Sequence, residues 1–162
     1  MEILEIEKSI WTHDDFEEMG WHDANIYGMV IENNDNPSAD FLLDIDYIFK
    51  WVNPVPPAQN YTFWIAPCTL IFKECFDLNI ECDTGGGYLE LFEIEDLCLN
   101  EKTEQEKNRF VYKWTIELQQ GVIELKSYGL EQVVRQKPAH VKNQVLSLGE
   151  RGGINFGRKS YK

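Results

Sequence analysis

The stretch FLLDIDYIFKW, residues 41–51, alternates apolar and polar side chains with a period of two. One face carries the aliphatic and aromatic residues, and the other carries Asp44, Asp46 and Lys50. This pattern predicts a long β-strand with one side buried and the other in water. The stretch IYGMVIE at 26–32 is predicted to be a neighbouring strand, because NNDNPSAD between them is a turn-rich connection.

Period-two stretches continue along the rest of the chain and are separated by loop signals. A short helix is predicted near 13–19, where acidic residues follow Thr12 and Gly20 gives a stop. Further strands are predicted in YTFWIAP, TLIFKECFDLNIEC, YLELFEIEDL, RFVYKWTIEL and VIELKSYGLEQVV. Loops are predicted in NPVPPAQN, DTGGGY and the solvated run NEKTEQEKN.

These elements predict a mainly β (β-rich α+β) fold in a single domain over 1–162. Parallel strands need crossover helices, for which the connections leave no room. We therefore expect an antiparallel curved sheet or a two-sheet sandwich of seven to nine strands with one short N-terminal helix.

The net charge of −13 is divided unevenly along the chain. Residues 135–162 hold seven basic residues and one acid, whereas the other 134 hold eight basic and 27 acidic residues. The acidic body should repel nucleic acid and anionic membranes and attract a basic protein partner. We expect the basic segment to fold over this body rather than bind RNA, with the tail 149–162 partly mobile.

Other features of the sequence bear on the cellular location of the protein and on metal binding. No apolar run approaches the ~20 residues that span a bilayer, and the acidic N-terminus is unlike a signal peptide. A cytoplasmic location follows as the expectation, and it suits the four cysteines as free thiols. Their spacing does not fit a zinc site, so neither a metal nor a cofactor is predicted.

One polar cluster is a candidate for chemistry: His22, Asp23, Asp44 and Asp46. If strand 26–32 pairs with strand 41–51, the His22–Asp23 pair lies at a strand end near the two aspartates. The four could then hold a divalent cation or act as an acid–base pair. The alternative, which we favour, is that the aspartates line a wet strand face and His22–Asp23 is a latch that satisfies backbone groups.

Aromatic residues supply a second set of candidates. Trp51, Trp64 and Tyr128 are candidate interface residues, provided that they are exposed near the proline-rich loop. A larger strip is expected to be core, although it could line a cavity for an apolar ligand. That strip comprises Trp51, Phe63, Trp64, Phe72, Tyr112 and Trp114.

The stretches WHDANI, LLDIDYI and FWIAPCTLIF, within residues 20–75, resemble small bacterial proteins of unknown function. Some of these are similar to immunity proteins of polymorphic toxin systems. The resemblance implies a compact α+β or mostly β protein that neutralises a toxin by binding it, and it carries over no catalytic residue. Our favoured hypothesis is a non-enzymatic binding protein, with an enzyme using the His22 cluster and an apolar-ligand binder as alternatives.

Overall fold

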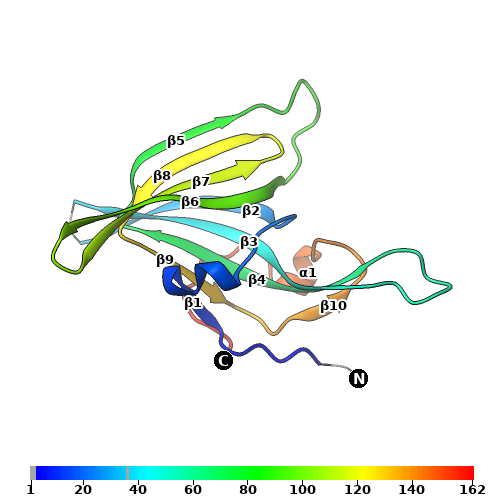
Figure 1. Cartoon of the computed structure of the whole chain (residues 1–162). Helices are drawn as coiled ribbons and strands as arrows, with labels where there is room; N and C mark the ends of the chain where they lie inside the picture. Colours follow the sequence, from blue (N-terminus) through cyan, green and yellow to red (C-terminus); the bar gives the residue numbers. More distant parts are fainter. Residues whose placement is uncertain (1–2, 36) are drawn as a thin grey trace.

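The computed structural model describes residues 3–35 and 37–162, in which all strand pairings are antiparallel. The strand order is β1-β9-β4-β3-β2-β6-β7-β8-β5, and β10 pairs with β4 outside this path (Figure 1). The elements are β1 (Ile10–Thr12), η1 (His13–Glu18), β2 (Asn25–Asn33), β3 (Ala39–Val52), β4 (Thr62–Lys73), β5 (Phe76–Cys82), β6 (Phe92–Glu106), β7 (Arg109–Leu118), β8 (Gly121–Ser127), β9 (Gly129–Val134), β10 (Ala139–Val141) and α1 (Leu148–Arg151). The predicted mainly β, antiparallel fold is confirmed.

The sheet bends between β4 and β5 and between β8 and β9, and this bend divides it into two halves. The β4–β9 ladder ends at Lys73 opposite Gly129, and the β5–β8 ladder begins at Phe76 opposite Lys126. We call β5, β6, β7 and β8 the upper half, and β1, β2, β3, β4, β9 and β10 the lower half, as they lie in Figure 1. The halves also meet where the start of β2 pairs with the start of β6.

The main core lies between the two halves. The lower half contributes Leu43 and Ile45 from β3, and the upper half contributes Trp114 and Ile116 from β7, all at 0% exposure. Burial of such side chains is the main driving force for the fold, at about 1.5–3 kcal/mol for each large one. Trp21 enters the same core, and its indole N–H donates to Gln132 at 2.8 Å.

The lower half is covered on its other face as well. Residues 142–162, which we call the C-terminal segment, cross this face and leave Asp44 and Asp46 with no exposure. The prediction that these aspartates line a wet strand face is therefore wrong. Strand β3 is buried on both sides for most of its length.

The short helix is confirmed as a 3-10 helix, η1. Thr12 caps its N-terminus, and the Thr12 amide donates to Asp15 at 2.9 Å in a capping box. Across the described residues, no helix has the length and apolar character needed to cross a membrane.

The described residues form ten strands instead of seven to nine, and several boundaries differ from the predictions. TLIFKECFDLNIEC and VIELKSYGLEQVV are each divided between two strands at the bend. At the bend, Glu74 and Asp77 have positive φ values of 47° and 52°. The run NEKTEQEKN, predicted to be a loop, instead extends β6 to Glu106, because its backbone pairs with β7 even where both faces are in water.

Candidate functional site

Asp44 and Asp46 are held by one buried arginine. The Arg151 guanidinium donates to Asp44 at 2.7 and 2.8 Å and to Asp46 at 3.1 Å, and all three side chains are fully buried. Helix α1 delivers Arg151, and its Ser147 N-cap and left-handed Gly152 C-cap fix both ends of this single turn. The cation also lies 3.7 Å from the ring centroid of Tyr27.

Further partners complete the Asp44 site. Arg135 donates to Asp44 at 2.6 Å and to the Thr69 hydroxyl at 2.8 Å. The Asn155 amide donates to the second Asp44 oxygen at 2.9 Å. Asp44 is thus fully buried with donors on both of its oxygens, which is the arrangement of a structural ion pair rather than of an open site.

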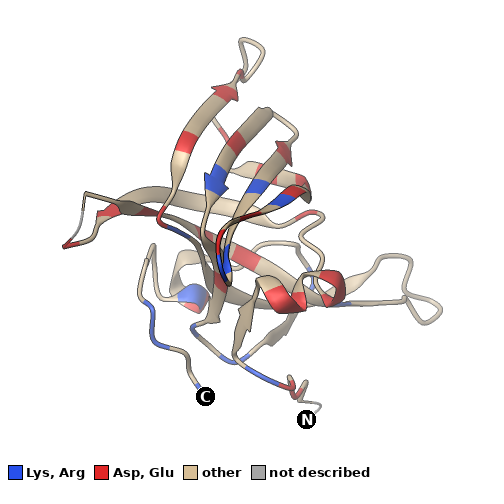
Figure 2. Cartoon of the chain, turned by 60° about the vertical axis from the view of Figure 1, so that its left-hand side comes forward, with Lys and Arg blue, Asp and Glu red and all other residues tan. Residues whose placement is uncertain are grey.

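Asp46 and Asp40, the carboxylates of β3 on either side of Asp44, also accept hydrogen bonds from other groups of the protein. Asp46 accepts the Leu146 amide at 2.8 Å, and Asp40 accepts from Arg158 at 2.7 Å and from the Glu74 amide at 2.8 Å. The two arginines of the C-terminal segment, Arg151 and Arg158, thus pair with carboxylates of the same chain, and Figure 2 shows the blue residues of this segment running below the sheet.

The pKa directions reflect this balance of burial and pairing. Burial raises the pKa of Asp46, and the Leu146 amide and Arg151 only partly oppose it. Burial also acts on Asp40, but the Glu74 amide, Arg158 and Asn34 together lower the pKa of that carboxyl. Asp46 is therefore the carboxylate for which desolvation prevails over pairing.

His22 and Asp23 form a separate pair at the surface. His22 Nδ1 lies 3.1 Å from Asp23, and the other Asp23 oxygen accepts from Gln144 at 2.9 Å. The His22 side chain is 72% exposed. Among the described residues, no hydrogen bond or ion pair links His22 or Asp23 with Asp44 or Asp46. The structure thus brings each pair together but does not join the two pairs.

Asp23 also has a structural connection at this junction. Its amide donates to the Ile94 carbonyl at 2.8 Å, and its φ of 68° places it in the left-handed region. Burial and the neighbouring Asp23 raise the pKa of Glu93. The Asp23 backbone thus joins the start of β2 to β6, whereas, within the described part of the chain, the side chains of His22 and Asp23 bond each other and Gln144 and not the backbone groups that the latch hypothesis named.

The three candidate interface aromatics differ in exposure. Trp51 is 42% exposed and packs edge-on against Tyr61 beside the proline-rich loop. Trp64 is only 5% exposed because His140 stacks on it, and Tyr128 is half-buried at the bend. Only Trp51 of the three therefore offers a large exposed surface near that loop.

A cavity of about 500 Å³ lies between β2 and the segment before β6. Consecutive residues on both sides line it, which places the cavity between β2 and the non-strand segment 89–91 that leads into β6. Its lining comprises Ile26, Tyr27, Gly28, Met29, Leu89, Glu90, Leu91 and Phe92. None of the six strip aromatics is among them. Of that strip, Phe72, Tyr112 and Trp114 lie in the main core.

Acidic residues face one another on the outer face of the upper half. Asp96 of β6 lies opposite Glu117 of β7, which lies opposite Val122 of β8, which lies opposite Glu81 of β5. We call Asp96, Glu117 and Glu81 the acidic row; all three are exposed. Sequence reasoning missed this row, because the cross-strand register places its members together.

The acidic row has no recorded counter-charge. Among the ion pairs of the described residues, none involves a member of the row. Like charges directly opposite each other in a sheet are destabilising. Ligand atoms of Asp96, Cys98 and Glu117 lie within 4.8 Å of one another. Burial and Asp96 raise the pKa of the Cys98 thiol to about 11.

No protein-family model matches the chain, and comparisons with curated proteins and with solved structures give no match either.

Proposed function

We propose that the protein is a non-enzymatic binding module whose acidic upper half docks a basic protein partner. The observation that carries this proposal is the acidic row, in which Asp96 faces Glu117 without a counter-charge. Such a row costs stability in the free protein and gains favourable contacts when cationic side chains lie over it.

The division of charge between the halves supports this assignment. Residues 76–127, which make up the upper half, hold 12 acidic and five basic residues. Figure 2 shows these acids on several of its strands. By contrast, Asp40, Asp44 and Asp46 of the lower half are paired with arginines inside the molecule. The upper half therefore has a net charge of −7 (five basic against 12 acidic residues) that no buried ion pair of the described residues takes up, and the exposed acids of η1 add to the negative field that a partner meets.

The likeness of residues 20–75 to immunity proteins fits the same reading, with a basic toxin as the partner. In this proposal the protein acts in the cytoplasm, binds no nucleic acid and needs no cofactor. The enzyme alternative lacks a converged cluster, since His22 and Asp23 have partners different from those of Asp44 and Asp46.

A labelled octalysine peptide tests the proposal by fluorescence anisotropy at low salt. We expect the double variant Asp96→Lys/Glu117→Lys to bind it about tenfold more weakly than wild type, and added salt to weaken wild-type binding. The matched control is Glu17→Lys/Glu18→Lys in η1, which makes the same charge change on another exposed surface. Equal weakening in both double variants would show a non-specific effect of net charge and refute the proposal.

A further inference from the structure

Strand β5 is a free edge of the sheet. It pairs only with β8 among the described residues and lies outermost in the upper half (Figure 1). All seven of its residues are exposed. A free edge offers a row of unpaired N–H and C=O groups to another chain.

Strand β5 has few of the features that commonly prevent a free edge from pairing with another chain. Its sequence FDLNIEC contains neither proline nor lysine, the residues that commonly block edge pairing. Its two charges are Asp77, which pairs with Lys126 at 3.2 Å, and Glu81, which belongs to the acidic row. A bulge near Asp77 disturbs the strand at its start, but the register from Asn79 to Cys82 is regular.

The two faces of β5 differ in chemistry. Ile80 lies opposite the fully buried Ile123, so it is on the face turned toward the core, yet it remains 44% exposed. Leu78, two residues away on the same face, is 36% exposed. Glu81 is on the other face, at the end of the acidic row.

We infer that an extended segment of the basic partner adds to the sheet as a further strand along β5. Its side chains on the inner face would be apolar and cover Leu78 and Ile80. Its side chains on the outer face would be basic and lie next to Glu81, continuing the row from Asp96 and Glu117. The occupant is therefore a strand that alternates apolar and basic residues, bound by main-chain hydrogen bonds and by side chains on both faces. This inference rests on the proposed function and specifies how the partner attaches.

Charge favours such a segment over a second copy of this chain. Edge-to-edge pairing of two β5 strands would bring together two upper halves, each with 12 acidic and five basic residues. A basic strand meets the same edge with attraction.

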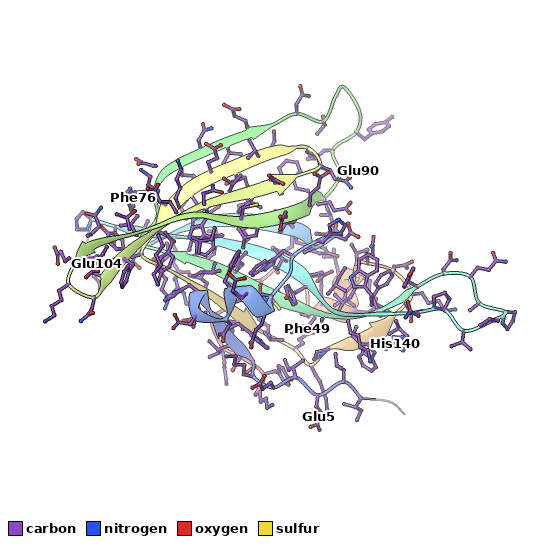
Figure 3. The ribbon with its side chains drawn as sticks, viewed as in Figure 1. Glu5, Phe49, Phe76, Glu90, Glu104 and His140 are labelled. Carbon is purple, nitrogen blue, oxygen red and sulfur yellow. The ribbon has the colours of Figure 1, made fainter. Side chains whose placement is uncertain are left out.

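The backbone of β5 is also fixed in place for this role. Gly121 of β8 approaches so closely that an added Cβ would lie 1.9 Å from the Glu81 carbonyl oxygen, and its φ is +155°. Figure 3 labels Phe76 at the start of β5, which runs along the top of the upper half. The edge strand is thus already ordered in the free protein, which lowers the entropic cost of adding a further strand.

The test uses an eight-residue peptide that alternates lysine and valine, in comparison with the same peptide N-methylated at every residue. The two peptides have equal charge, but the second has no backbone amide donor at either edge. We expect the first to bind about tenfold more tightly than the second. In hydrogen exchange it should slow the amides of Phe76–Cys82 and leave those of β10 unchanged.

Two variants of the protein complete the test. Ile80→Lys should weaken binding of the alternating peptide about tenfold, because it places a cation on the apolar face of the edge. Ile31→Lys is the control, since Ile31 is an exposed aliphatic residue (69%) on β2. It should change binding less than about twofold.

The outcomes separate this inference from the proposed function. Equal binding of both peptides, together with weakening by Asp96→Lys/Glu117→Lys, overturns strand addition and keeps the acidic docking face. No effect of that double variant overturns the proposed function itself. A concentration-dependent dimer of the free protein that Ile80→Lys abolishes would identify a second copy as the occupant and overturn the inference.

Discussion

The lower half holds Asp44 and Asp46 out of water around Arg151, whereas the upper half leaves Asp96 and Glu117 opposite each other in water. In the lower half each carboxylate has its own cation or amide donor, because an unpaired buried charge would be prohibitively costly. In the upper half solvent screens the repulsion, so an uncompensated row is tolerated at a small cost. The comparison shows that sequence-level charge alone does not reveal which acids are available to a partner.

The largest predicted effect comes from removing the cation of the lower half. Arg151→Met should lower the free energy of unfolding by about 3–5 kcal/mol, because it leaves Asp46 buried without its cation and Asp44 with Arg135 alone. Urea denaturation measures this change. The matched control is Arg109→Met in the upper half, where the exposed pair with Glu74 at 3.0 Å should contribute less than about 1 kcal/mol. Equal losses in the two variants would refute the contrast between the halves.

A smaller effect is predicted at Asp40, and it depends on pH. Because the pKa of Asp40 is lowered from its ordinary value of 3.8, its ionised form stabilises the fold above that pH. The stabilisation is lost as the pH falls through the lowered folded-state pKa. Asp40→Asn should therefore cost about 1.5–3 kcal/mol at neutral pH. This difference from wild type should shrink as the pH drops below 3.8. Urea unfolding at a series of pH values checks this, and a difference independent of pH would contradict it.

The smallest predicted effect has the opposite sign. Glu117→Lys replaces the repulsion with Asp96 by attraction, so it should stabilise the free protein by about 0.2–1 kcal/mol. The same substitution should weaken binding of the octalysine peptide. Thermal unfolding and anisotropy measured on one preparation give both values. A variant that is less stable than wild type would show that the row is not under repulsion.

The sequence predicted the inner face of the sheet well. Alternation in residues 41–51 places Leu43 and Ile45 on the apolar face of a long strand, and both are in the core between the halves. The helix near 13–19 was predicted from Thr12 and the acids that follow, and the same residues form the capping box of η1. These features depend on short-range patterns, which a sequence displays directly.

The covered outer face could not be predicted from the same pattern. Asp44 and Asp46 look like a solvated strand face, and the residue that buries them, Arg151, follows about 100 residues later without any periodicity. The one feature of the sequence that indicated this burial was the contrast in charge between the basic C-terminal segment and the acidic remainder of the chain. The bend at Glu74 was also hidden, because Lys73 and Glu74 interrupt the apolar alternation only briefly before it resumes at Phe76, while the backbone turns at a positive φ.

The most direct test of the account is amide hydrogen exchange in the C-terminal segment. We conclude that this segment belongs to the fold and that its Arg151 pairs with Asp44 and Asp46 of β3. The amides of Leu146 and Asn155, which donate to Asp46 and Asp44, should exchange at least about 100-fold more slowly than in an unstructured chain. Exchange of both amides at the unstructured rate would contradict this conclusion, because Asp44 and Asp46 would then lack the donors that keep them paired inside the lower half.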